Sequence, residues 1–196
     1  MNAEVAAPAK HGDGLRADAR RNYQRLLAAA GAAFAERGAD DVSLEEIARR
    51  AGVGIGTLYR HFPTRQALLE AVYRDQVDAL DARAAELIES DSPAAALTEW
   101  LTALVAFSKA KRSLTTGMLD SDLLSACREV LHGVTETLLA RAQQAGAVRA
   151  DVQGADVMRL THAVSLAADM GQDPGQAERM LALVCDGLLS QPNPPR

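Results

Sequence analysis

Apolar residues recur every three or four positions along most of the chain, which is the spacing of one face of an α-helix. No stretch alternates apolar and polar residues as a half-buried strand does, and Ala and Leu dominate over aromatic residues. We therefore predict an all-α protein of about nine helices. The expected helices cover residues 17–37, 43–51 and 54–61, long stretches from 65 and from 93, a short or broken 114–119, and residues 121–145, 152–170 and 174–189.

Local signals mark the ends of these predicted helices. Ser43 precedes an apolar run and Glu46 follows three residues later, which is the sequence of a capping box. Gly52 supplies the stop of that helix. Ser92-Pro93 and Asp173-Pro174 each combine a cap with proline at the first helical position.

The pattern divides the chain into three regions. Residues 1–15 are Ala, Pro, Gly and polar residues without periodicity, so we expect a disordered N-terminal arm. Residues 16–75 contain the first three predicted helices and the start of a fourth, and are expected to form a small domain. Residues 76–196 carry the longer helices and form a larger helical domain.

Composition narrows the class of protein. Hydrophobic residues make up 48% of the chain, which excludes a disordered protein, and no apolar run approaches the roughly 18 residues of a membrane span. The first residues lack the apolar segment of a signal peptide. Cys127 and Cys185 lie far apart in apolar helical patterns, and we interpret both as reduced thiols. We therefore expect a cytoplasmic protein without a membrane partner.

The net charge of −5 conceals an uneven distribution. Residues 1–65 hold 10 Lys or Arg against 8 Asp or Glu, whereas residues 66–196 hold 11 against 18. A mildly basic end on an acidic body fits a protein that presents only that end to DNA.

Residues 43–62 contain what a helix-turn-helix requires. Ala48 has almost no side chain and allows two helices to pass closely, and Gly52 permits the left-handed backbone of a sharp turn. Ile47, Val53 and Leu58 are placed to hold both helices on the first one. The outer face of the short third helix can then enter the major groove, which is roughly 12 Å wide.

The run AGVGIGTLYRHFPTRQALL, residues 51–69, resembles the signature of TetR-family transcriptional regulators. The resemblance is strong over about residues 17–75, and weaker to the C-terminal domain of many actinobacterial members. It implies a DNA-binding domain at 16–75 and a dimerisation and ligand-binding domain at 76–196. It also implies a homodimeric repressor that a small molecule releases from DNA when the fourth helix shifts.

Carried over residue by residue, the resemblance implies a set of DNA contacts. Arg60 is the candidate for a base-edge contact, because arginine can bind guanine with two hydrogen bonds. Ile55 stands where many relatives have lysine, which favours contact with a thymine methyl over a phosphate. The implied contacts are Ser43, Ile55, Gly56, Thr57, Tyr59, Arg60, His61, Thr64 and Arg65, with Arg20 and Arg21 on the backbone or an adjacent minor groove.

Structural alternatives exist for several of these residues. Tyr59 and His61 can also pack the small domain, and Arg20 and Arg21 can be surface charges. Arg49 and its neighbour Arg50 are interpreted as a solvated face of the second helix.

The last two predicted helices carry apolar faces that a single chain of this size has too few partners to cover. We therefore expect a symmetric four-helix contact between two copies, and hence a near-palindromic operator on double-stranded DNA. The expected contact residues are Val157, Leu160, Val164, Ala167, Met180, Leu181, Val184 and Leu188.

The bulky aromatic and sulfur side chains of the larger domain gather on a few helices among alanine and glycine. This predicts a mostly apolar cavity for a moderately hydrophobic small molecule, with segment 114–119 as a movable wall. The alternative is that these side chains fill one another's space. The expected lining residues are Trp100, Phe107, Met118, Leu131 and Met158, with His132 or His162 supplying a hydrogen bond.

Enzymatic chemistry is not expected. No His pair has the i, i+4 spacing of helical zinc sites, and the Asp120–Asp122 cluster is interpreted as a helix start. We therefore predict no catalytic residue, metal or cofactor. The alternatives left open are an activator, a ligand-independent repressor, and a small-molecule-binding protein that binds DNA only non-specifically.

Overall fold

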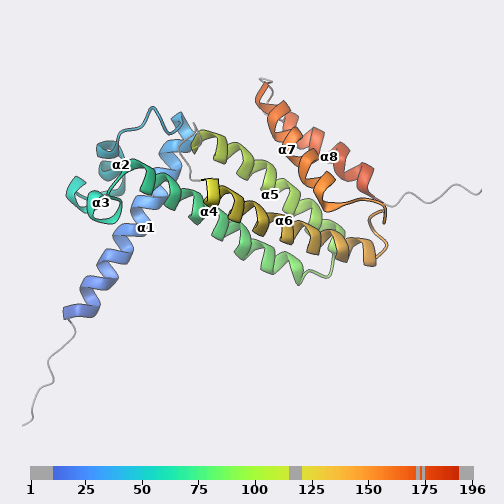
Figure 1. Ribbon diagram of the computed structural model, residues 1–196, viewed down its shortest axis with the longest axis horizontal. Helices are drawn as coiled ribbons and strands as arrows, with labels where there is room; N and C mark the ends of the chain where they lie inside the picture. Colours follow the sequence, from blue (N-terminus) through green and yellow to red (C-terminus); the bar gives the residue numbers. More distant parts are fainter. Residues whose placement is uncertain (1–10, 115–120, 171–172, 174, 190–196) are drawn as a thin grey trace, which may run out of the picture. The chain divides into compact units, whose positions relative to one another are not determined.

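The computed structural model describes residues 11–114, 121–170, 173 and 175–189, and these residues contain eight helices (Figure 1). The helices are α1 (His11–Arg37), α2 (Leu44–Ala51), α3 (Ile55–His61), α4 (Arg65–Ile88), α5 (Pro93–Leu114), α6 (Ser121–Gln144), α7 (Gly154–Met170) and α8 (Gln176–Leu188). The chain forms two compact units that divide between Val72 and Tyr73, inside α4. The expected short helix at 114–119 falls mainly on residues 115–120, which lie outside the described residues.

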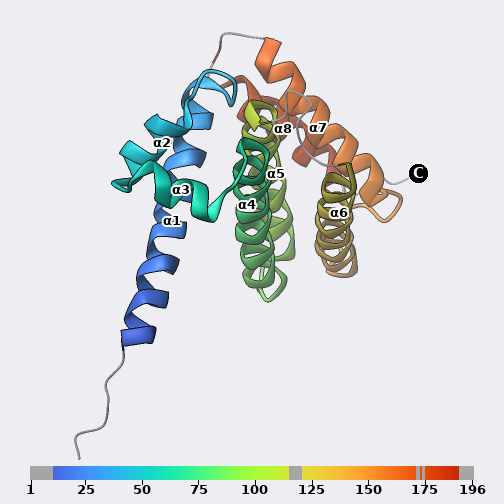
Figure 2. The same cartoon turned by 60° about the vertical axis from the view of Figure 1, so that its left-hand side comes forward.

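The first unit is a small bundle of α1, α2, α3 and the start of α4. Figure 2 shows α2 and α3 lying against the C-terminal half of α1, whose N-terminal half continues beyond them. The core consists of side chains at helical spacing that are fully or almost fully buried: Leu26, Ala30, Phe34, Ile47, Leu58, Phe62, Leu68 and Leu69.

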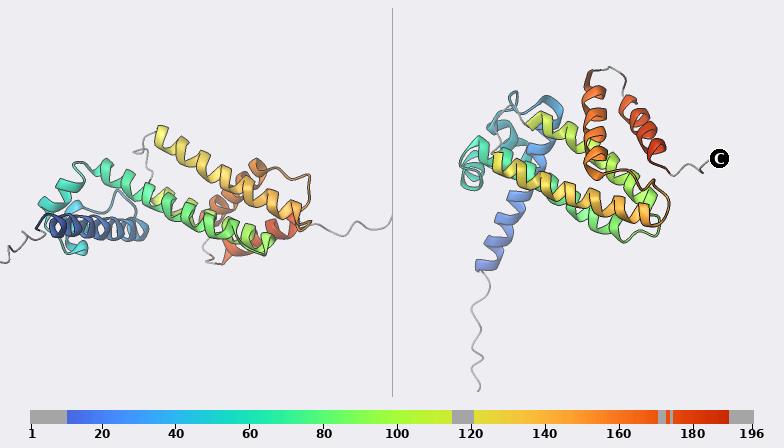
Figure 3. Two further views of the ribbon diagram at one scale, coloured as in Figure 1. Left: turned by 90° about the horizontal axis from the view of Figure 1, so that it is seen from below. Right: turned by 45° about the vertical axis from the view of Figure 1, so that its right-hand side comes forward.

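The second unit contains the rest of α4 and helices α5 to α8. α5 contacts α6, α7 and α8, and α7 and α8 pack as a pair (Figure 3). Arg83 of α4 forms an ion pair with Glu99 of α5, and the ring of Tyr73 lies 5.6 Å from that of Phe107. α5 is therefore the central helix of this unit, which explains why its inward side chains Trp100 and Leu101 are completely buried.

The observed starts of three helices differ from the expected ones by two residues or more. α1 begins at His11, so residues 11–15 are helical and the expected disordered arm is at least five residues too long. α7 and α8 begin two residues later than expected, at Gly154 and Gln176.

Candidate nucleic-acid interface and inner cavities

The turn between α2 and α3 is built by Gly52. Its backbone is left-handed, with φ of 65° and ψ of 37°, and its N–H donates back to the last carbonyls of α2. The following N–H, that of Val53, donates to the Ala48 carbonyl at 3.0 Å. A Cβ at position 52 would lie 2.5 Å from Nη2 of Arg25, the flexible end of a side chain that can move aside, so the left-handed conformation is what favours glycine there.

α3 presents one face outward and one face inward. Leu58 is completely buried, whereas Ile55 and Tyr59 expose 38% and 46% of their surface. Arg60 is exposed, and among the described residues no ion-pair partner is found for its guanidinium. A ligand can therefore contact Arg60, Tyr59 and Ile55 on this outward face without breaking contacts inside the protein.

Thr57 and His61 lie at the edge of this face and are half-buried. The His61 ring meets Tyr23 of α1 edge-on at 5.8 Å, and Tyr23 also packs on Phe62 at 5.1 Å. His61 thus contributes to packing of the small unit, as the structural alternative anticipated. Gly56 is exposed on the outward face and has open space around its Cα.

Hydroxyl groups cap the two helices that flank α3. The Oγ of Ser43 accepts a hydrogen bond from the N–H of Glu46 at 3.1 Å, and Oγ1 of Thr64 accepts one from Ala67 at 3.1 Å. Both residues are exposed. Each hydroxyl keeps its own proton for donation to a phosphate beside the positive end of a helix.

The other arginines predicted to contact DNA differ in the contacts that their side chains make within the protein. The guanidinium of Arg65 donates to the carbonyl of Ala39 and lies 5.9 Å from the centre of the Phe34 ring, so it supports the loop before α2. Arg21 pairs with Asp18 one turn earlier on α1, and Arg20 is exposed.

An ion network fastens α2 to α1. Glu46 receives hydrogen bonds from Arg37 and Arg50, and Arg50 also reaches Glu36 at 2.7 Å. The hydrogen bond from Arg37 is the main cause that lowers the pKa of Glu46 below its ordinary value, with Arg50 contributing. The Glu46 side chain therefore links α2 to α1. The capping box expected from the sequence placed this side chain back toward Ser43 instead.

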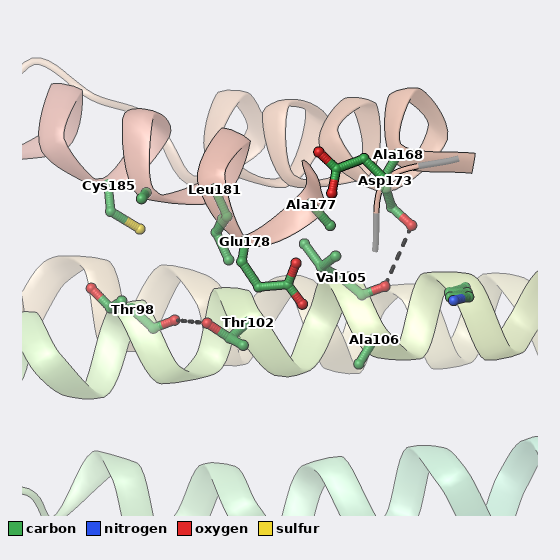
Figure 4. A pocket seen from close by; sticks show the side chains of 13 residues that line it. Thr98, Thr102, Val105, Ala106, Ala168, Asp173, Ala177, Glu178, Leu181 and Cys185 are labelled. Atoms are coloured by element: carbon green, nitrogen blue, oxygen red, sulfur yellow. Dashed lines mark hydrogen bonds between the residues drawn. The ribbon is translucent and has the colours of Figure 1, made fainter. Parts of the chain in front are cut away.

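Two cavities lie among the described residues of the second unit and bear on the expected ligand site. One, here named the α5–α8 cavity, has a volume of about 680 Å³ and lies between α5, α7 and α8. Figure 4 shows the Glu178 carboxylate extending from α8 toward Thr102 and Val105 of α5. No residue of the expected ligand site lines this cavity among the described residues.

The other, here named the α4–α7 cavity, has a volume of about 560 Å³. Five residues of the expected ligand site line it: Phe107, Leu131, His132, Met158 and His162. Sequence reasoning missed Tyr73, which lies on α4, and the basic residues of the lining, which are Lys111, Arg112, Arg128 and Arg159.

Trp100 does not line this cavity. Its side chain is completely buried, and its indole Nε1 donates to Thr135 of α6 at 2.8 Å, because α5 is enclosed by its neighbours. Met118 lies outside the described residues.

The residues expected at the dimer contact differ in how exposed they are in a single chain. Val157, Val164, Leu181 and Leu188 are buried within one chain, because these sides of α7 and α8 pack on the rest of their own unit. Leu160 is exposed, whereas Ala167, Met180 and Val184 are half-buried. Further exposed apolar residues on these helices, which the sequence pattern did not single out, are Leu166, Met170 and Leu183.

A helix-turn-helix with an outward recognition helix, joined to a larger helical unit, defines a DNA-binding transcriptional regulator. A family model for bacterial regulatory proteins of the tetR family matches residues 26–72. A second model, for the C-terminal domain of SbtR-like transcriptional regulators, matches residues 92–190. The chain belongs to the TetR family of transcriptional regulators.

Solved structures agree over nearly the whole chain. A TetR transcription regulatory protein from Mycobacterium vanbaalenii is 37% identical with a TM-score of 0.73, and the match covers 90% of this chain and 99% of that one. The TetR transcriptional regulator SCO0520 from Streptomyces coelicolor is 36% identical with a TM-score of 0.71, and the match covers 86% of this chain and 99% of that one. An HTH-type transcriptional regulator from Staphylococcus aureus is 39% identical over 64 residues, and the chain spans about a third (35%) of this curated relative.

Among the described residues, no helix is both long and apolar enough to cross a membrane. None of the His, Cys, Asp and Glu side chains of these residues form a group of three or more that could hold a metal ion.

Proposed function

We propose that this regulator is a homodimeric, cytoplasmic repressor that acts by binding alone, without catalysis. The observation that carries the proposal is the outward face of α3, where Arg60 and Tyr59 are exposed on a helix fixed by Gly52 and Leu58. Arg60 reads a guanine edge, and Thr57 and Tyr59 contact phosphates or a thymine methyl. Ser43 and Thr64 bind phosphates at their helix ends.

The dimer forms through the exposed apolar sides of α7 and α8. Leu160, Ala167 and Met170 follow one another at helical spacing on α7, and Met180 and Leu183 do so on α8. Exposed apolar patches of this kind mark protein contacts, and a two-fold contact between identical helix pairs buries them reciprocally. Two-fold symmetry then favours a near-palindromic operator.

The α4–α7 cavity is the proposed site of the effector. Its volume of about 560 Å³ falls within the range of small-molecule sites, and α4, which supplies Tyr73, also belongs by its first residues to the DNA-binding unit. An effector that binds better to the form unable to hold DNA releases the operator, with a coupling of about 1–3 kcal/mol.

The test is selection of bound duplexes from a random DNA pool, followed by titration at several salt concentrations. The expected result is a near-palindromic site with a large advantage over random DNA at every salt concentration. Equal affinity for all sequences would favour the alternative of non-specific binding. The position of the selected site relative to a promoter then separates a repressor from an activator.

A further inference from the structure

The α5–α8 cavity combines a wall of small apolar side chains with polar groups at its edge. Short side chains dominate the wall and leave a volume of about 680 Å³ between the helices. The apolar wall consists of Val105, Ala106, Ala168, Ala177, Leu181 and Ala182. A wall of this kind accepts the hydrocarbon part of a small molecule, and the polar groups decide which head group fits.

The charged side chains of the described lining are Asp173, Glu178 and Lys109. The carboxylate of Asp173 is already occupied, because it accepts hydrogen bonds from the Arg179 guanidinium and, at 3.0 Å, from the N–H of Gly175. Among the residues that the structure describes, the Glu178 carboxylate forms no ion pair. Glu178 therefore supplies an acceptor that the protein itself leaves available.

The hydroxyl groups that α5 contributes to the lining add acceptors. Oγ1 of Thr98 donates to the carbonyl of Ala94 at 3.0 Å, and Oγ1 of Thr102 donates to the carbonyl of Thr98 at 2.9 Å. A hydroxyl whose proton is used in this way can only accept further hydrogen bonds. Figure 4 shows the Glu178 carboxylate extending toward Thr102, so a carboxylate and a hydroxyl oxygen face the same part of the cavity.

The one lysine of the described lining lies at a distance from these acceptors. Lys109 follows Thr102 by seven residues on α5, which places it on the same helix face two turns, or roughly 10 Å, farther along. Lys109 and Glu178 form no ion pair with each other in the described part of the chain. The acceptors therefore remain open to a cation from outside.

We propose that the α5–α8 cavity binds an organic ammonium ion, with the ammonium held by the Glu178 carboxylate and the Thr102 hydroxyl. The hydrocarbon part of the ligand packs against Val105 and Leu181. A neutral ligand of the same shape makes a weaker bond to the carboxylate, because only one of the two partners is then charged. An anionic ligand places a second negative charge beside Glu178. This site is separate from the proposed effector cavity and does not rest on the proposed function.

The test is isothermal titration of the full chain with octylammonium and with 1-octanol, which share one alkyl chain and differ in head-group charge. Octylammonium is expected to bind at least about tenfold more tightly, because both partners are charged in its complex with Glu178. Equal affinities, or no binding of octylammonium at millimolar concentration, would overturn the proposal.

Variants of the lining locate the site. Glu178→Gln should remove the preference for octylammonium and leave the affinity for 1-octanol unchanged. Lys109→Gln should raise the affinity for octylammonium by about twofold, because it removes a repelling charge roughly 10 Å away in water. Effects of opposite sign are not expected if both side chains only stabilise the fold. An unchanged preference in the Glu178 variant, or a lower affinity in the Lys109 variant, contradicts the assignment.

A second variant and a control complete the experiment. Thr102→Val removes only a hydroxyl from an exposed position and should weaken octylammonium binding severalfold. Glu129→Gln is the matched control, because Glu129 is exposed on α6 and lines neither the α5–α8 nor the α4–α7 cavity. Thermal unfolding checks that each variant is folded. An equal loss in the Glu129 variant would show general attraction to an acidic surface and would overturn the site.

Discussion

The indole Nε1 of Trp100 donates a hydrogen bond to Oγ1 of Thr135 at 2.8 Å, and both side chains are completely buried. The same hydroxyl donates to the carbonyl of Leu131 one turn earlier on α6, at 2.8 Å. The pair joins α5 to α6 in the second unit while leaving neither polar group unsatisfied. Trp100 is therefore part of the support behind the α4–α7 cavity and not part of its wall.

Thr135→Val should lower the free energy of unfolding by about 1–3 kcal/mol, because the variant keeps the shape but leaves the indole N–H of Trp100 buried without an acceptor. Urea unfolding measures this as a lower midpoint at an unchanged slope. The matched control is Thr137→Val, since Thr137 is exposed on the same helix and its hydroxyl donates to the carbonyl of Gly133 on that helix. Equal losses in both variants would contradict a specific role of the pair.

Gly52→Ala should destabilise the first unit by about 1–2 kcal/mol, because a left-handed backbone brings Cβ too close to its own carbonyl. Arg25 must also move away, which its flexible side chain permits. Operator affinity should fall as well, since this turn sets the direction of α3. The control is Gly54→Ala. Gly54 has a φ of −71°, and a Cβ there would have no neighbour within 4 Å, so the free energy of unfolding should change little in this variant.

Arg60→Ala should weaken binding to the selected operator by about 1–3 kcal/mol and relax the choice of base at one position in each half-site. Thermal unfolding should be unchanged because the side chain is exposed. Titrations with the operator and with single-base variants measure both effects. Arg49→Ala, an exposed change on α2, is the control. Unaltered operator affinity in the Arg60 variant would refute the base contact.

Leu183→Glu should shift the protein from dimer to monomer, because it places a charge in an apolar contact. Leu183 is 72% exposed in a single chain, so the fold of each protomer should persist by circular dichroism. Sedimentation velocity at micromolar concentration distinguishes the two species. Val130→Glu changes an exposed apolar residue of α6 and should leave the dimer intact. A dimer that survives the Leu183 change would place the contact elsewhere.

The ion network around Glu46 predicts acid sensitivity. The pKa of Glu46 is lowered in the folded protein, so the unfolded chain binds more protons and the free energy of unfolding falls as the pH drops below about 4.5. Glu46→Gln should lower stability at pH 7 and lose less of it on acidification. Urea unfolding between pH 7 and 3 measures the difference, with Glu45→Gln, an exposed neighbour, as control. Parallel pH profiles of the wild type and the Glu46 variant would contradict the role of the network.

Structural features that depend on residues close together in the sequence were predictable from the sequence. The caps at Ser43 and Thr64 and the left-handed turn at Gly52 occur where their residue types place them. The helical start at His11 was not predictable in this way, since Gly12 and Gly14 weaken the local helical signal.

The sequence alone thus determined the helical class, most helix ends and the helix-turn-helix, because capping, turn conformation and apolar periodicity act over a few residues. Only the tertiary structure decided which apolar side chains are enclosed. Val157 and Leu160 lie three residues apart on the same helix, yet one is completely buried and the other is 48% exposed. The same packing brings Lys111 of α5, Arg128 of α6 and Tyr73 of α4 around one cavity. Periodicity predicts that a helix has an apolar face, but burial and the gathering of charges depend on which helices pack against it.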